Sequence, residues 1–134
     1  MKNEYYKESD PGYVAGLGEM LRSARLYVAL SRDGFATKLG MAERSYRRME
    51  SGERPIPPGL LDTMDAVLDE FDSAVEMVIE RASRSGDLVI EVRDDPEGEW
   101  HRAVVGRAAI ESRRIMPTLL TSTQREERHR GARH

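Results

Sequence analysis

Apolar residues recur at intervals of three and four in the first part of the chain, and this spacing predicts three helices. Asp10 and Pro11 would begin the first helix, because proline suits the first helical turn. Ser31 is a good N-cap for the second helix, and Gly40 would end it. The third helix is expected over residues 42–51. Three short helices joined by tight turns therefore open the chain.

The longest apolar pattern covers residues 58–83 and has the spacing of a heptad seam. Its six apolar residues follow one another at intervals of four, three, four, three and four: Leu60, Met64, Val67, Phe71, Ala74 and Val78. Such a seam is typical of a helix that packs against another helix along its length. We therefore expect a long fourth helix with one apolar face.

Residues 88–93 predict one short strand, because their side chains alternate between two faces. One face would carry Leu88, Ile90 and Val92, and the other Val89, Glu91 and Arg93. Asp95 and Pro96 would begin a further helix that carries Trp100, and Pro117 would end that helix. The strand has no expected partner within its own chain. Because an unpaired strand exposes backbone groups on both edges, we expect it to pair with another chain.

The second and third helices have the arrangement of a helix-turn-helix motif, in which the second helix of the pair enters the major groove of DNA. Ala36 is the small residue where the two helices would cross, and Gly40 supplies the turn. Tyr46 and Met49 would hold the third helix against the first. The outer face of the third helix then consists of Glu43, Arg44, Arg47 and Arg48.

The composition argues against several classes of site. The chain of 134 residues contains no Cys, so we expect neither disulfides nor thiolate ligands, which fits a reducing compartment. Its three histidines, His101, His129 and His134, lack the spacing of a metal site, and no phosphate-binding glycine loop is present. No segment has the length and hydrophobicity of a membrane span or a signal peptide. We therefore expect a cytoplasmic protein that is not an enzyme and uses no metal or other cofactor.

The net charge of −3 conceals an uneven distribution along the chain. Residues 60–80 contain seven acidic residues and no Lys or Arg, whereas four arginines lie close together at positions 44, 47, 48 and 54. One face of the protein could therefore bind phosphate while another repels it.

Residues 17 to 71 resemble the Cro and phage-repressor type of helix-turn-helix regulators, often called the XRE family. The resemblance lies in "LRSAR" of the first helix, in "LSRDGFATKLGM" through the second helix and turn, and in "RSYRRMESG" of the third helix. The pattern "SYRRMESGERPIP", followed by a long helix, a strand and a Trp-bearing helix, is most similar to phage regulators associated with anti-CRISPR operons. Two positions depart from the family pattern: Gly34 lies inside the second helix, and Ala42 replaces the usual hydroxyl cap of the third.

The resemblance and the element pattern together predict a mainly α protein. Residues 10–58 would form a lambda-repressor-like helix-turn-helix domain that binds DNA. Residues 59–116, with the long helix, one short strand and a further helix, would form a dimerisation region. Residues 117–134 are polar and charged and would form a disordered tail.

The expected DNA contacts divide into two sets. Glu43, Arg44 and Arg47 would contact base edges, and Glu43 could accept a hydrogen bond from a cytosine amino group. The residues expected to contact phosphate are Ser31, Arg32, Lys38, Ser45, Arg48 and Arg54. The resemblance also implies a structural pair of Arg25 with Glu50. The alternative for the outer arginines is that they only solvate a surface helix.

We expect a homodimer, because a domain of this size offers few contacts for tight specific binding to DNA. The residues expected in the dimer interface are Leu60, Met64, Val67, Phe71, Ala74, Val78, Leu88, Ile90, Val92 and Trp100. The alternative is that the heptad seam packs wholly inside one subunit, against the helix that carries Trp100. A two-fold dimer would require an inverted-repeat operator.

The predicted function is that of a transcription regulator, expected to repress its own phage or bacterial operon by excluding polymerase from a promoter. Two alternatives remain at this point. The first is an antitoxin-type protein whose C-terminal part binds a toxin. The second is a regulator that uses the same arginines to bind RNA, since A-form helices are recognised through shape and phosphate.

Overall fold

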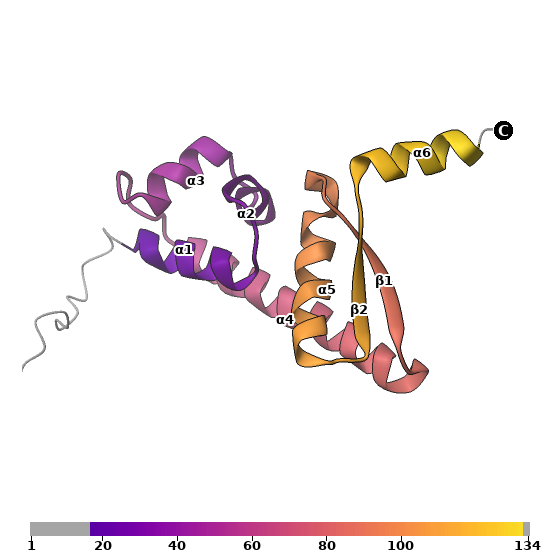
Figure 1. Ribbon diagram of the computed structural model, residues 1–134. Coiled ribbons are helices and arrows are strands. Elements are labelled where there is room, and N and C mark those ends of the chain that lie inside the picture. The colour runs from indigo at the N-terminus through magenta and orange to yellow at the C-terminus, as the bar shows by residue number, and fades with distance from the viewer. Residues whose placement is uncertain (1–16, 133–134) are drawn as a thin grey trace, which may run out of the picture.

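The computed structural model describes residues 17–132, which form six α helices, one 3-10 turn and a two-stranded sheet (Figure 1). In chain order the elements are α1 (Gly18–Tyr27), α2 (Arg32–Leu39), α3 (Glu43–Glu50), α4 (Leu60–Ser85), β1 (Leu88–Arg93), η1 (Pro96–Gly98), α5 (Glu99–Glu111), β2 (Ile115–Leu120) and α6 (Ser122–Ala132). The three short helices lie at one end of α4, while α5 and the sheet lie along the rest of it (Figure 1). This confirms a mainly α fold with an N-terminal helix-turn-helix domain.

The short helices end where local sequence signals predicted. The Ser31 hydroxyl accepts a hydrogen bond of 3.0 Å from the Gly34 amide and caps α2. Gly40 adopts a left-handed conformation with φ of 75°, which glycine tolerates better than other residues, and so ends α2. The expected start of the first helix at Asp10 lies outside the described residues. Within them, α1 begins at Gly18.

One hydrophobic core joins the helix-turn-helix domain to the C-terminal half of the chain. The rings of Phe35 and Tyr46 meet edge to face, with centroids 5.6 Å apart, and tie α2 to α3. On α4, the Phe71 ring packs edge-on against Tyr27 of α1 and Trp100 of α5, at 5.9 and 5.6 Å. Phe71 therefore lies at the junction of the two halves.

The heptad seam of α4 faces the interior of its own chain. Four of the ten residues expected in a dimer interface are buried: Met64, Val67, Phe71 and Val92. The other six are partly buried and pack against the core: Leu60, Ala74, Val78, Leu88, Ile90 and Trp100. The buried residues of the seam therefore pack within their own chain, against α1, α2 and α5, which agrees with the alternative of a seam covered inside one subunit.

The strand β1 has a partner in its own chain, which corrects the expectation of a single strand. It pairs in parallel with β2, in the register Leu88 with Ile115 through Arg93 with Leu120. Parallel strands need a crossover connection, and α5 supplies it. Pro117 lies within β2 instead of ending a helix; proline is tolerated in a strand with one open edge because it need not donate there.

The C-terminal segment is ordered into β2 and α6, where we expected a disordered tail from residue 117. No residue of α6 that the structure describes is buried, so apolar packing does not hold this helix. Polar contacts hold it. Arg128 forms two hydrogen bonds of 2.9 and 3.0 Å with Glu91 of β1, and Arg125 lies 2.6 Å from Asp95.

Over residues 17–132, no helix combines the length and the apolar character that crossing a membrane requires.

Candidate nucleic-acid interface

The turn between α2 and α3 fixes the angle at which α3 leaves the domain. Ala36 is fully buried at the crossing of the two helices, and its carbonyl accepts hydrogen bonds from the amides of Gly40 and Met41. Tyr46 and Met49 bury the inner face of α3. Because both helices are held through fully packed side chains, the outer face of α3 has a defined direction.

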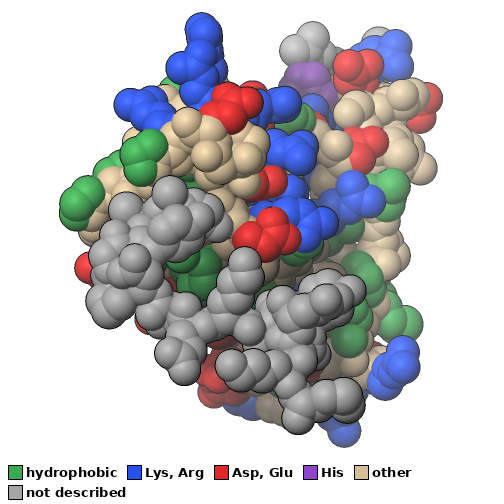
Figure 2. All heavy atoms as spheres, turned by 90° about the vertical axis from the view of Figure 1, so that its left-hand side faces the viewer, with side chains coloured by type: hydrophobic (Ala, Val, Ile, Leu, Met, Phe, Trp, Pro, Cys, Tyr) green, Lys and Arg blue, Asp and Glu red, His purple; other side chains and the backbone are tan. Residues whose placement is uncertain are grey.

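The outer face of α3 carries the arginines. Arg44, Arg47 and Arg48 are exposed, while Glu43 is half-buried at the start of the helix. Basic side chains project from this side of the molecule in Figure 2, with an acidic side chain among them. The structure thus places the three predicted base-contacting residues on one exposed surface with Arg48.

Arg47 and Glu43 form an ion pair one helical turn apart, with a distance of 2.6 Å. The pair holds the guanidinium of Arg47 along the helix surface. Among the described residues, Arg44 forms no ion pair within 4.0 Å, so its guanidinium remains available to an acceptor on another molecule.

The residues predicted to contact phosphate differ in their exposure and in their partners. Arg48 and Arg54 are exposed, and the Arg54 amide donates to the Arg48 carbonyl at 3.1 Å, which draws the loop after α3 back toward the helix. Ser45 is half-buried on α3. Arg32, at the start of α2, donates to Glu50 at 3.3 Å and is half-exposed.

Lys38 is engaged by the C-terminal half of the chain. Its ammonium lies 2.8 Å from Glu70 of α4 and 3.9 Å from the centre of the Trp100 ring. Two separate interactions therefore hold the charge that was expected to meet a DNA phosphate.

Glu99 meets Ser31 at the N-terminus of α2, and sequence reasoning missed this residue. One carboxylate oxygen of Glu99 accepts the Ser31 amide hydrogen, and the other accepts from the Ser31 hydroxyl at 3.1 Å. The two residues are 68 positions apart, so no local pattern points to their contact. The one available signal was Gly34, the unusual glycine within the second helix.

The structure brings Arg25 and Glu50 together, as the resemblance implied. Two nitrogens of the Arg25 guanidinium lie 3.0 Å from the two carboxylate oxygens of Glu50, and a third donates to the Leu30 carbonyl at 3.2 Å. The Tyr46 hydroxyl donates to the same carboxylate. This network ties α1 to the C-terminal end of α3.

The network stays charged because its members stabilise one another. Burial raises the pKa of Glu50, but hydrogen bonds from Arg25 and Tyr46 and the nearby positive charges outweigh burial, so the pKa lies below its ordinary value. The hydrogen bond with Glu50 raises the pKa of Arg25. Burial, together with the carboxylate of Glu50, raises the pKa of Tyr46. The tyrosine is therefore a proton donor to a fixed anion.

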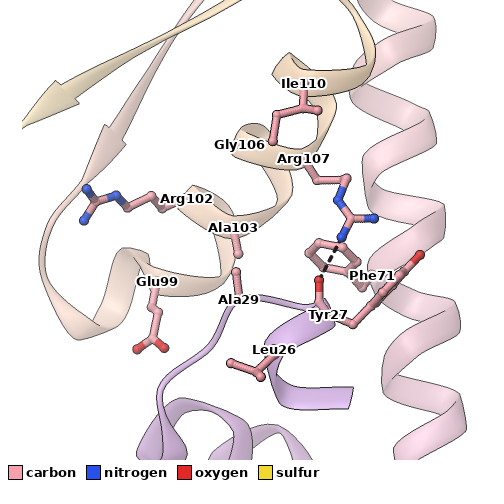
Figure 3. A pocket seen from close by; sticks show the side chains of 10 residues that line it. All are labelled: Leu26, Tyr27, Ala29, Phe71, Glu99, Arg102, Ala103, Gly106, Arg107 and Ile110. Atoms are coloured by element: carbon pink, nitrogen blue, oxygen red, sulfur yellow. Dashed lines mark hydrogen bonds between the residues drawn. The ribbon is translucent and has the colours of Figure 1, made fainter. Parts of the chain in front are cut away.

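A hollow of about 490 Å³ lies where the end of α1 meets α4 and α5 (Figure 3). Within it, the Arg107 guanidinium lies 4.5 Å from the centre of the Tyr27 ring and donates to the Tyr27 carbonyl at 3.1 Å. This cation–π contact fastens α5 to the end of α1.

Residues 17–74 match the family model of a helix-turn-helix domain. The matched segment holds α1, α2, α3 and the first part of α4, which is a little under half of the chain. A search among curated proteins finds no match to the chain. The family match and the exposed arginines of α3 together support a DNA-binding regulator.

Proposed function

We propose that this protein is a sequence-specific transcription regulator that inserts α3 into the major groove of an operator. The observation that carries the proposal is the outer face of α3, where three exposed arginines project from a helix held by buried packing. Arginine reads guanine through two hydrogen bonds in the major groove, and a fixed helix makes that reading position-specific.

Arg44 and Arg47 have different roles in this proposal. The guanidinium of Arg44, which forms no ion pair with the residues that the structure describes, approaches a guanine directly. Arg47 reads a second base pair in the orientation that Glu43 imposes through their ion pair. Glu43 is thus either a positioning residue for Arg47 or the acceptor for a cytosine amino group.

The remaining polar residues position the protein on the duplex. Phosphate contacts fix register and orientation without carrying sequence information. Arg48 and Arg54 suit this role because both are exposed beside the outer face of α3. Ser45 and Arg32 flank them. Ser31 and Lys38 can join only when their present partners in the C-terminal half release them.

We propose further that the regulator binds as a homodimer to an inverted repeat. The surface we assign to the second copy is an apolar strip formed by Met77, Val89 and Met116. Val89 and Met116 are cross-strand neighbours in the sheet, and Met77 lines the same groove of about 730 Å³ as Val89. Their exposed fractions of 71%, 63% and 47% are high for large apolar side chains.

The kind of operon that the protein regulates is proposed from the resemblance of its sequence to phage regulators. A dimer bound over a promoter excludes polymerase, so we propose an autoregulatory repressor of a phage or bacterial operon, of the kind associated with anti-CRISPR genes.

Selection of bound duplexes from a random DNA pool tests the proposed function. We expect an enriched inverted repeat whose half-sites contain guanine and lie about 34–36 Å apart, one helical turn. RNA hairpins of matched length serve as competitors. Failure to enrich any DNA sequence, or displacement of the protein by RNA at equal concentration, would contradict the proposal.

A further inference from the structure

We infer that Glu99 is an internal competitor of DNA: its carboxylate occupies the place of a backbone phosphate at the N-terminus of α2 and must leave before Ser31 contacts a duplex. This inference rests on the proposed function. It adds a contact by which the C-terminal half of the chain restrains DNA binding.

The geometry of the contact is that of an anion at a helix terminus. The Glu99 carboxylate accepts hydrogen bonds from the amide and from the hydroxyl of Ser31. The same hydroxyl oxygen accepts a hydrogen bond of 3.0 Å from the Gly34 amide. In Figure 3, Glu99 projects from the start of α5 toward the segment that leads from α1 into α2, while Arg102 points elsewhere. Both donors of Ser31 are therefore already hydrogen-bonded to Glu99 and cannot bind a phosphate at the same time.

The Glu99 carboxylate is held at α2 by hydrogen bonds and not by an ion pair. Both of its hydrogen bonds among the described residues come from Ser31, and no described Lys or Arg lies within 4.0 Å of it. The N-terminus of a helix carries a partial positive charge and favours a carboxylate or a phosphate for the same reason. Two anions repel each other at one helix end, so Glu99 and a DNA phosphate exclude one another.

Gly34 leaves the space in which the Glu99 carboxylate lies. A Cβ atom at this position would lie 2.7 Å from one carboxylate oxygen of Glu99 and 2.9 Å from its carboxyl carbon, closer than side chains approach in proteins. Glycine inside a helix is otherwise unfavourable. The missing side chain therefore makes room for the carboxylate on α2.

The same half of the chain also holds the other end of α2. Trp100, which follows Glu99 directly, contacts the Lys38 ammonium, and Glu70 of α4 forms an ion pair with it. Movement of the start of α5 away from α2 would release Ser31 and weaken the hold on Lys38 together. Both residues then become available to phosphate.

The test compares two variants that break the contact in different ways. Glu99→Gln removes the charge, whereas Gly34→Ala keeps the carboxylate and displaces it by collision. Glu111→Gln is the control, because it removes an equal charge from the exposed far end of α5. Affinity for a fluorescently labelled random-sequence duplex is measured by anisotropy across a series of KCl concentrations, and thermal unfolding shows that each variant is folded.

We expect Glu99→Gln and Gly34→Ala to bind the duplex about two- to fivefold more tightly than Glu111→Gln, the effect of one charge at a helix end. The slope of log affinity against log salt should steepen by about 0.9, because one more phosphate is contacted.

A purely structural role for Glu99 predicts the opposite sign. If both variants bind no more tightly than Glu111→Gln while the wild-type protein binds, Glu99 is only a cap of α2 and the inference is overturned with the proposed function intact. If neither the wild-type protein nor any variant binds duplex, the proposed function fails and the inference fails with it.

Discussion

Arg25 of α1 and Glu50 at the end of α3 form a two-pronged ion pair, with both N···O distances at 3.0 Å and side chains only 11% and 6% exposed. Because Arg32 and Tyr46 contact the same carboxylate, one anion joins α1, α2 and α3. The direction of the outer face of α3 therefore depends on a contact made behind it.

Removal of one partner should destabilise the protein strongly. We expect Arg25→Ala to lower the free energy of unfolding by about 3–5 kcal/mol, since it leaves a nearly buried carboxylate without its main partner. Urea denaturation measures the change. Arg22→Ala is the matched control, because its pair with Glu19 is exposed and should contribute less than about 1 kcal/mol. Equal losses of unfolding free energy in the two variants would mean that the buried pair stabilises the protein no more than the exposed pair does.

The same carboxylate makes stability depend on pH. The folded protein lowers the pKa of Glu50 below its ordinary value of 4.5, so the ionised form favours folding. Its contribution is complete above the ordinary pKa and is lost as the pH falls through the lowered folded value. We expect the stability difference between wild type and Glu50→Gln to be largest near neutral pH and to shrink in acid. Urea denaturation along a pH series checks this, and a difference that stays constant would refute it.

Two helical glycines should respond to alanine with opposite signs. A Cβ on Gly18 would overlap the backbone carbonyl oxygens of Met49 and Glu50, which cannot yield as a side chain can. We expect Gly18→Ala to destabilise by about 1–3 kcal/mol. Gly106 lies within α5 with nothing within 4 Å of such an atom, so Gly106→Ala should stabilise by about 0.5–1 kcal/mol. Thermal unfolding of both variants decides, and a shift of the same sign in each would contradict this account of the packing.

Dimerisation should depend on the apolar strip of the sheet. We expect Val89→Lys to shift the protein toward monomer in light scattering, because a charge replaces a side chain that is 63% exposed at the centre of the strip. Ile110→Lys is the control, since Ile110 is even more exposed but lies on α5 beside the hollow of Figure 3. Point variants suit this test better than truncation after α3, because α4 covers the core of the helix-turn-helix domain. A wild-type monomer, or equal effects of the two variants, would exclude the strip as the interface.

The elements that could be predicted from the sequence are those with local signals. Ser31 and Gly40 determine the ends of α2 through contacts within four residues, so a short window of sequence contains the information. Apolar spacing likewise revealed the inner face of α3. Spacing does not say which surface covers an apolar face, so the sequence leaves both a second copy and the Trp100 helix of the same chain as partners for the seam of α4.

The elements that escaped prediction depend on distant partners. The β2 sequence contains Pro117 and lacks alternation, and only its pairing with β1 and its packing against α5 make it a strand. The polar helix α6 depends on contacts of Arg128 with Glu91, 37 positions earlier, and of Arg125 with Asp95, 30 positions earlier. The contact of Glu99 with α2 depends on the whole fold between them.

Base reading by α3 is the central claim, and the binding of Arg44→Ala to a selected operator tests it most directly. Affinity is measured for the selected duplex and for duplexes with single base-pair changes in each half-site. We expect Arg44→Ala to lose about 1–3 kcal/mol of binding free energy and to lose its preference at one position, with thermal stability unchanged. Arg84→Ala, which removes an equal charge from the exposed end of α4, should bind like the wild type. Wild-type affinity and wild-type base preference in Arg44→Ala would contradict the claim.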